Sequence, residues 1–322
     1  MNFPARVRPA GHWASINEVS FVAGMRLLFW IHRRLGAWPF RAVLYPVVGW
    51  YVLTKPAARA ASLKYLRHLE RQPCAVGMKP GVKGVLRHFS AFAEAILDKM
   101  LLWGGLFPLD QTVLHGQETM TAAIAGKRGG VIICSHLGNL ELCRVLARRR
   151  AGLKISVLVH TKHAQAFNRM LAQLDPDSQL NLMQVSELSP ATAMLLSQKV
   201  EQGEFVAIAG DRIPVSPNPR VATVPFLGNA APFPVGPYVL ASLLKCPVYL
   251  LFSMRAGAGS EVYFEHFRDA IRLPRAGRDQ ALDGLAAEYA ARLEHFCLQA
   301  PLQWFNFYDF WHLPSKDESD AS

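Results

Sequence analysis

Residues 131–141 read VIICSHLGNLE, and the order of residue types in this stretch predicts a strand, a turn and a helix. The first three residues are β-branched, which is typical of a buried strand in a parallel sheet. Asn139 is suited to cap a helix, which the apolar periodicity predicts over Leu140–Arg150. The stretch therefore places His136 at the open end of a buried strand.

A carboxylate follows this histidine at a distance that allows the two side chains to pair. Glu141 falls in the first turn of the expected helix, where the helix dipole favours a negative charge. A carboxylate that accepts from one ring N–H fixes the tautomer and leaves the other nitrogen able to take a proton from a hydroxyl group. About one His-x4-acid pair is expected by chance in a chain with 11 His and 24 acidic residues, so the spacing alone is not specific. A second pair, His312 and Asp317, follows no strand. The alternative for His136 is a buried histidine satisfied at a strand end.

Strands and helices alternate along most of the chain. We expect strands over Val131–Cys134, Lys154–His160, Leu180–Val185, Phe205–Gly210, Pro247–Met254 and Val262–Phe267, and helices over Val82–Leu102, Leu140–Arg150, Ala164–Leu174, Pro190–Gln202, Pro237–Leu244 and Leu282–Cys297. This pattern predicts an α/β fold with a mostly parallel central sheet and helices on both faces. Ligands of such sheets bind at the carboxyl ends of the strands, which is where His136 is expected.

A second group of polar residues follows the strand expected to end at Ala209. Asp211 and Arg212 lie there, and they reach the same sheet edge as His136 if the two strands run parallel. An arginine at this edge could bind a phosphate or carboxylate through two hydrogen bonds, or stabilise a developing oxyanion. A strand-end pair that serves only its own loop is an equally open interpretation.

The absence of other known motifs argues against several classes of enzyme. The sequence has no Gly-x-Ser-x-Gly elbow, no dinucleotide-binding glycine motif and no Walker loop, and we expect no cofactor. His160 and His163 have no acidic or cysteine partner at ligand spacing, so we expect no metal. Lys162 and Asn168, near the end of the strand predicted over residues 154–160, are available for a phosphate or a sugar, although they could equally be a solvated helix start.

The N-terminal quarter is both basic and apolar. Residues 1–72 hold eleven Lys and Arg against two Glu, which is nine of the eleven net positive charges of the chain. The apolar segments Val19–Ile31 and Ala42–Thr54 are too interrupted or too short to cross a bilayer. Their Trp and Tyr residues and the adjacent arginines fit an interfacial anchor on anionic lipid, with a buried helical subdomain as the alternative. Nucleic-acid binding is not expected, because no binding motif accompanies the charge.

The domain organisation and the cell compartment follow from the same features. We expect a membrane-associating helical region over residues 1–75, an α/β domain over residues 76–312 and a disordered polar tail over residues 313–322. The five cysteines are scattered and mostly in apolar contexts, which favours a reducing environment. No signal peptide is apparent in the first residues.

Taken together, these motifs resemble a known family. The segment from Ser135 to Glu141 is similar to the His-x4-Asp/Glu motif of the bacterial lipid A biosynthesis (late) acyltransferases, within the wider lysophospholipid acyltransferase superfamily. The resemblance extends to Asp211-Arg212, to Pro225-Phe226-Leu227-Gly228 and to residues 232–237. It covers most of residues 15–312 and favours a catalytic role for His136 over the buried-histidine alternative.

The resemblance implies transfer of a fatty acyl chain from acyl carrier protein to a hydroxyl group of a membrane lipid, at the cytoplasmic face of the inner membrane. It implies that His136 is the general base and Glu141 its orienting carboxylate. Asp211, Arg212, Asn139 and Gly228 are the residues we expect at the substrate, together with Lys162 and Asn168. The acceptor is left open between lipid A and other outer-membrane or polyene lipids, because Leu-Gly-Asn follows the histidine and Asp-Arg stands where many members have Asp-Gln-Asp.

Two alternatives differ in donor or in chemistry. An acyl-CoA-dependent lysophospholipid acyltransferase would use the same residues with another donor. A non-catalytic lipid-binding protein on the membrane surface would keep its function without His136.

Overall fold

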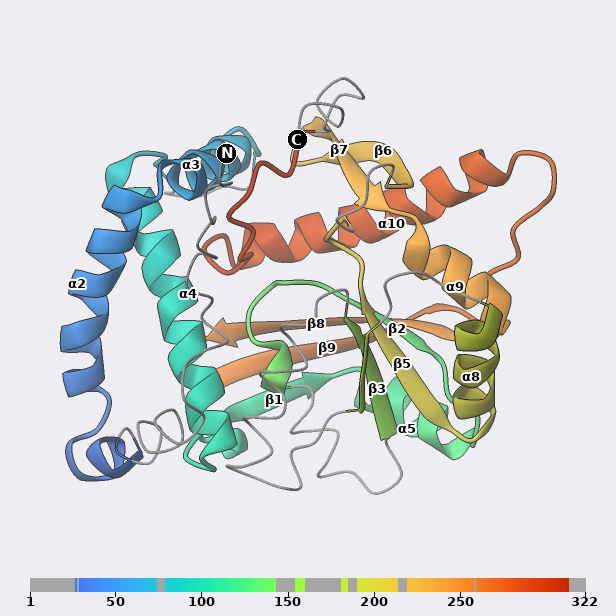
Figure 1. Cartoon of the computed structure of the whole chain (residues 1–322), viewed down its shortest axis with the longest axis horizontal. Helices are drawn as coiled ribbons and strands as arrows, with labels where there is room; N and C mark the ends of the chain where they lie inside the picture. Colours follow the sequence, from blue (N-terminus) through green and yellow to red (C-terminus); the bar gives the residue numbers. More distant parts are fainter. Residues whose placement is uncertain are drawn as a thin grey trace, which may run out of the picture.

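A seven-stranded sheet forms the centre of the molecule (Figure 1). The computed structural model describes residue 27 and residues 29–73, 79–142, 154–159, 181–184, 190–213, 219–257 and 259–312. The strands of the sheet are β1 (Thr112–His115), β2 (Val131–Cys134), β3 (Lys154–Val159), β4 (Asn181–Gln184), β5 (Glu204–Ala209), β8 (Val248–Ala256) and β9 (Gly259–Arg268). A separate hairpin consists of β6 (Val221–Phe226) and β7 (Asn229–Pro234).

The strand order is β1-β9-β8-β2-β5-β3-β4. Five of the six strand pairings are parallel, and the pairing of β8 with β9 is antiparallel. The predicted mostly parallel α/β sheet is thus confirmed. Because β2 lies between β5 and β8, the carboxyl end of the motif strand is at the centre of the sheet edge, where the folds of this class place their ligands.

Both faces of the sheet are covered by apolar side chains. All four residues of β2 are buried, as a continuous apolar run in a parallel strand predicts. Val131 and Ile133 pack with α9 (Gly236–Leu244), α10 (Arg278–Gln299) and the β6–β7 hairpin. Ile132 and Cys134 face the other way and pack with α5 (Gln117–Ala125) and β9. The expected helices on both faces are therefore present.

Three helices, α2 (Trp38–Thr54), α3 (Pro56–Glu70) and α4 (Val82–Trp103), stand at one end of the sheet (Figure 1). Arg41 of α2 forms an ion pair with Glu94 of α4, with 2.8 Å between Nε and Oε1. Val48 and Val52 of α2 are buried in the core that also contains β2. In the described part of the chain, no helix combines the length and the apolar character needed to span a membrane.

The predicted elements are found with small shifts at their ends. The six predicted strands are confirmed. The helices predicted around residues 82–102, 190–202, 237–244 and 282–297 are also confirmed, and they are α4, α8 (Pro190–Glu201), α9 and α10. The helix predicted over Leu140–Arg150 begins at residue 140 and is described to residue 142. The helix predicted over Ala164–Leu174 lies outside the described residues, as does the tail from residue 313. Strands β1, β6 and β7, helix α5 and the short 3-10 turn Leu109–Gln111 were not predicted.

Candidate active site

His136 and Asp211 form a hydrogen-bonded pair at the carboxyl ends of two neighbouring parallel strands. His136 follows β2, Asp211 follows β5, and Cys134 is in register with Ala209. The His136 Nδ1 lies 2.8 Å from the Asp211 Oδ1, and the main-chain N–H of His136 donates to the Asp211 Oδ2 at 2.7 Å. The prediction that both residues reach one sheet edge is confirmed.

Local backbone features bring the two residues together. Gly210 lies between β5 and Asp211, and a Cβ at this position would lie 2.6 Å from Ile133 and 2.7 Å from the ring of Tyr289. The glycine therefore lets the chain pass between β2 and α10 towards His136. On the other side of the pair, Gly138 has a φ of +61°, which favours glycine. A Cβ on Gly138 would lie 2.0 Å from the main-chain oxygen of Ser253, so the turn after His136 is packed directly on β8.

The segment after α10 completes the surroundings of the pair. The indole Nε1 of Trp304 donates to the Asp211 Oδ2 at 2.9 Å. The Phe305 N–H donates to the main-chain oxygen of His136, and the Gly138 N–H donates to the oxygen of Gln303. Residues 303–305 thus run alongside the motif as an added β-bridge, which joins Leu137 to Trp304.

The electrostatics of the pair favour an ionised Asp211. Its side chain is fully buried, which by itself raises the pKa of the carboxyl, but the charge and the two hydrogen bonds of His136 and the Trp304 N–H hold that pKa below its usual value. An ionised carboxylate can only accept, so Nδ1 of His136 carries the proton that is shared with Asp211. The imidazole is 31% exposed. Its other nitrogen, Nε2, can then accept a proton from a hydroxyl group.

Asp211, which the sequence placed only at the substrate, is a hydrogen-bond partner of the His136 ring. The sequence predicts Glu141 as the residue that orients His136 and Asp211 as a residue that shapes the substrate site, whereas in the structure the Nδ1–H of His136 donates to Asp211. The Glu141 N–H donates to the Asn139 Oδ1 at 3.2 Å, which is the predicted helix cap. The Glu141 carboxylate interacts electrostatically with Lys99 of α4. A pairing of Glu141 with His136 stays a prediction.

Arg212 and Lys99 add positive charge close to this pair. Arg212 is exposed, and its guanidinium donates to the main-chain oxygen of Phe305 at 3.4 Å. Burial lowers the pKa of Lys99; nearby Arg212 lowers it further and Glu141 opposes the shift. Lys99 is a site-adjacent residue that was not predicted. Its place on the predicted helix gave no indication that it lies near Glu141 and Arg212.

Of the remaining predicted site residues, Gly228 and Asn139 belong to the described part of the chain. Gly228 forms the turn between β6 and β7 with a φ of +76°, next to Gln72. The positive φ accounts for a glycine at this position. A contact of Gly228 with a substrate stays a prediction. Lys162 and Asn168 lie outside the described residues. Asn139 is buried, and its main-chain oxygen accepts from the Ser253 hydroxyl.

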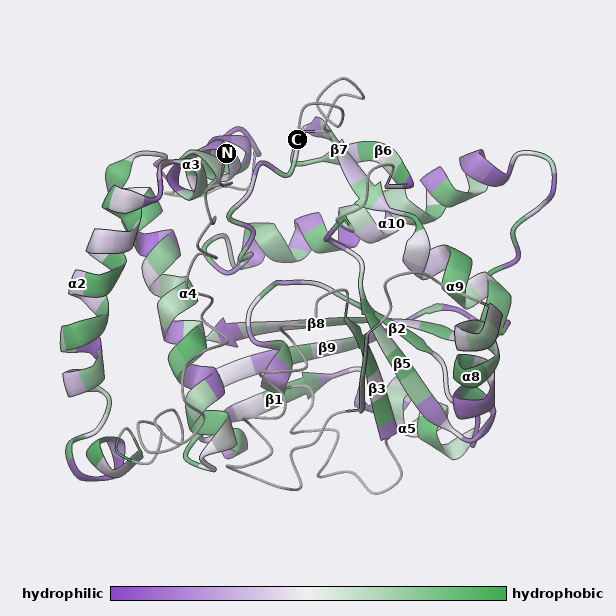
Figure 2. Ribbon diagram, in the orientation of Figure 1, coloured by the Kyte–Doolittle hydropathy of each residue, from purple (hydrophilic) through white to green (hydrophobic). Residues whose placement is uncertain are grey.

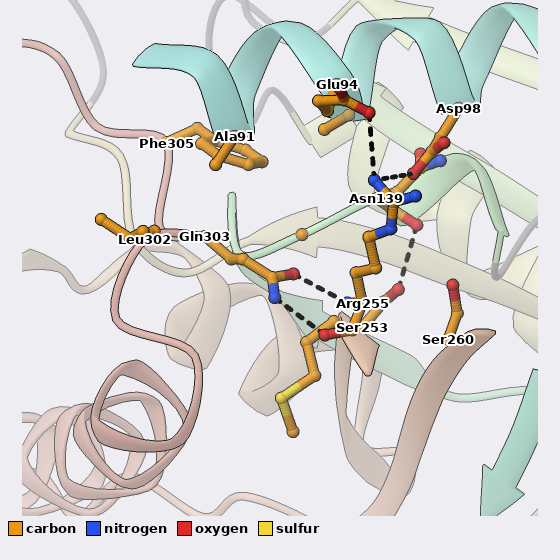
Figure 3. A pocket seen from close by; sticks show the side chains of 13 residues that line it. Ala91, Glu94, Asp98, Asn139, Ser253, Arg255, Ser260, Leu302, Gln303 and Phe305 are labelled. Carbon is orange, nitrogen blue, oxygen red and sulfur yellow. Dashed lines mark hydrogen bonds and ion pairs between the residues drawn. The ribbon is translucent and has the colours of Figure 1, made fainter. Parts of the chain in front are cut away.

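A pocket of about 230 Å³ adjoins the motif at Gly138 and Asn139, between α4 and the end of β8 (Figure 3). Its wall includes an ion-pair cluster in which Arg255 contacts Glu94 at 3.3 Å and Asp98 at 3.8 Å. The Gln303 side chain exchanges two hydrogen bonds with the main chain of Arg255. The pocket therefore lies between the motif turn and this group of polar side chains, and His136 is not among its lining residues.

The comparisons with known proteins agree with the geometry. No curated protein matches the chain. The family model of the bacterial lipid A biosynthesis acyltransferases matches residues 109–312, which include the motif, Asp211 and Trp304. This match spans more than half of the chain, and the chain therefore belongs to the bacterial lipid A biosynthesis acyltransferase family and is an acyltransferase of lipid biosynthesis.

Proposed function

We propose that the protein transfers a fatty acyl chain from acyl carrier protein to a hydroxyl group of a membrane lipid or glycolipid, with His136 as the general base. His136 takes the proton of the acceptor hydroxyl at Nε2 while the oxygen attacks the thioester carbonyl. The carbon–sulfur bond then breaks, and the donor thiolate leaves with the proton that His136 took from the acceptor hydroxyl, which restores the neutral imidazole. The acceptor supplies the nucleophile, so no acyl-enzyme is needed.

The observation that supports this proposal most is the contact between His136 and the buried Asp211. The carboxylate stabilises the imidazolium that forms when His136 takes a proton. The main-chain bond from His136 to the same carboxylate fixes the histidine relative to β5. A histidine that only filled a strand end would not need two bonds to one buried acid.

The tetrahedral intermediate of acyl transfer carries a negative charge on oxygen, which a site must stabilise. Arg212, which is exposed and follows Asp211 directly in the chain, is the proposed donor and could also bind a phosphate of the acceptor. Asn139, Gly228, Lys162 and Asn168 complete the proposed substrate-binding set. Glu141 is proposed to support the motif beside Lys99.

Helix α2 supports a proposed location on the cytoplasmic face of the inner membrane. Hydrophobic residues alternate with near-neutral and polar ones along its ribbon (Figure 2). Its large exposed side chains are Trp38, Val43, Tyr45, Val47, Trp50, Tyr51 and Leu53. Exposed Arg33 and Arg34 precede this surface. Apolar groups bordered by arginines favour binding to the interface of an anionic leaflet.

The test is acyl transfer by purified protein in detergent. Labelled acyl carrier protein and labelled acyl-CoA of the same chain length are supplied in parallel with total bacterial membrane lipid. We expect labelled lipid from acyl carrier protein, and mass analysis of the product identifies the acceptor. Transfer only from acyl-CoA to lysophospholipid would replace the proposal with the lysophospholipid acyltransferase alternative. No transfer from either donor would contradict the proposed reaction.

A further inference from the structure

We infer that the indole N–H of Trp304 holds the Asp211 carboxylate in the orientation that serves His136, so that Trp304 is a positioning residue. The importance of this bond for turnover rests on the proposed function. The existence of the bond and its effect on the titration of His136 do not depend on the proposed function. Trp304 lies 93 residues after Asp211 in the sequence.

Three donors fix the two oxygens of Asp211. The Nδ1–H of His136 donates to Oδ1, while the His136 main-chain N–H and the Trp304 Nε1–H both donate to Oδ2. Of the three, Trp304 is the donor from outside the motif. Without it, the carboxylate would keep both contacts with His136 but would lose a bond to a buried, ionised oxygen.

The indole is itself held in place from several elements. Trp304 is fully buried, and its ring packs at 5.1 Å from the Tyr65 ring of α3 and at 5.3 Å from the Phe226 ring of β6. These aromatic contacts restrict the orientation of the ring. The direction of the N–H is therefore set before any substrate binds.

A second buried hydrogen-bond chain fixes the main chain of Trp304. His88 of α4 contacts the Trp304 oxygen through Nε2 at 3.0 Å and the Ser62 hydroxyl through Nδ1 at 2.9 Å. Burial lowers the pKa of His88 to about 4, so the ring is neutral at pH 7. A carbonyl can only accept, so Nε2 donates to Trp304 and Nδ1 accepts from Ser62. Helices α3 and α4 thus anchor the residue that contacts Asp211.

The added β-bridge keeps this anchor in register with the histidine. Leu137 pairs with Trp304, and the N–H of Phe305 donates to the main-chain oxygen of His136. The residue that donates to Asp211 is therefore tied through the backbone to the residue that Asp211 orients. A shift of one would move the other.

Loss of the indole N–H has a predictable electrostatic effect. A donor to Asp211 draws negative charge away from the oxygen that faces His136, so its removal strengthens the attraction of Asp211 for the imidazolium and raises the pKa of His136. The other charged or titratable groups around the pair stay the same in such a variant: Lys99, Glu141, Arg212, Tyr289, Cys297 and Tyr308.

The test compares Trp304→Phe with wild type and with Trp311→Phe. Trp311 packs in the same aromatic group, but its buried Nε1 has no hydrogen-bond partner in the described structure. We expect Trp304→Phe to lower kcat by about tenfold to a hundredfold, because a carboxylate without its third donor is no longer held in the orientation that serves His136. We also expect the acidic limb of kcat/KM to move to higher pH. Trp311→Phe should leave kcat within about twofold and the limb in place.

A readout without turnover separates this inference from the proposed reaction. The pKa of His136 is measured by NMR of histidine-labelled protein, with the signal assigned from His136→Gln. If Trp304→Phe loses its fold, benzothienylalanine at residue 304 keeps the ring shape and removes the N–H. An unchanged His136 pKa in a folded variant would overturn the inference. A raised pKa in a protein that transfers no acyl group would support it and contradict the proposed function.

Discussion

Asp211 holds His136 by two bonds at once, since one carboxylate oxygen accepts from the ring and the other from the main chain. The ring and the backbone of the histidine are thereby fixed to the neighbouring strand β5. The register of β2 and β5, in which Cys134 lies opposite Ala209, places the two residues within reach. The buried acid and the half-buried base therefore form one unit at the sheet edge.

We predict that Asp211→Asn costs far more activity than Glu141→Gln. An amide at residue 211 can turn its NH₂ group towards Nδ1 and favour the wrong tautomer, for which a loss of about three to four orders of magnitude in kcat is typical. Glu141→Gln should cost less, because the Asp211 bond is retained. Steady-state kinetics of both variants measure the difference. Equal losses would return the orienting role to Glu141.

Gly138→Ala is predicted to destabilise the motif turn. The residue has a φ of +61°, and an added Cβ would meet the Ser253 oxygen at 2.0 Å. The strain and the clash should lower the free energy of unfolding by about 3 kcal/mol or more. Chemical denaturation measures the change.

The matched control for this substitution is Gly284→Ala in α10. A Cβ there meets nothing within 4 Å, and the position is exposed in a helix. Alanine should therefore raise the free energy of unfolding by about 0.5–1 kcal/mol. A Gly138→Ala protein as stable as wild type would contradict the described turn.

The strands that could be predicted from the sequence are those with continuous runs of apolar residues. β2 and β5 are buried over almost their whole lengths, and such strands appear as continuous apolar segments. β1 has four residues with alternating burial, which is too short a pattern to identify. β7 contains two prolines, and prolines argue against a strand in sequence. Its pairing with β6 in a separate hairpin accommodates them.

The site was predictable only in part, for a physical reason. The sequence indicated that His136 and Asp211 end two strands, but the register that joins their side chains is a tertiary property. Glu141 is close to His136 in the sequence, which made it the expected partner. Trp304 reaches the site through a segment without regular structure. No local pattern marks its contact with Asp211.

The ion pairs of Glu94 predict a pH-dependent stability. Burial raises the pKa of Glu94, but the bonds and charges of Arg41 and Arg255 outweigh this and lower it below its usual value. A lowered folded-state pKa contributes stability above the unfolded-state value of about 4.5, and this contribution is lost as the pH falls through the folded-state pKa. Glu94→Gln should thus cost about 1 kcal/mol at pH 7 and less at pH 3.

Denaturation of both proteins at the two pH values measures this change. Asp269→Asn is the control, because the Asp269 side chain is fully exposed and pairs with the exposed side chain of His266. It should leave the stability at pH 7 unchanged. An equal effect of Glu94→Gln at pH 7 and pH 3 would contradict the role of the charge.

The exposed face of α2 predicts membrane binding. Trp50 and Leu53 are 70% and 72% exposed. Their joint replacement by serine should weaken binding to anionic vesicles at least tenfold, because each buried apolar side chain contributes about 1.5–3 kcal/mol. Vesicle sedimentation measures the loss. The control replaces Met194 and Leu195 of α8, at the opposite end of the molecule (Figure 1). If this control weakened binding as much, α2 would not be the binding surface.

The most direct test of the account is transfer of labelled acyl chain from acyl carrier protein to membrane lipid, with wild type beside His136→Ala. His136 is hydrogen-bonded to Asp211, and Asp211 is also hydrogen-bonded to Trp304. We predict labelled lipid from the wild-type protein and none above the no-enzyme background from His136→Ala, with both proteins equally folded. Equal labelling by the two proteins would contradict the assignment of His136 as the general base.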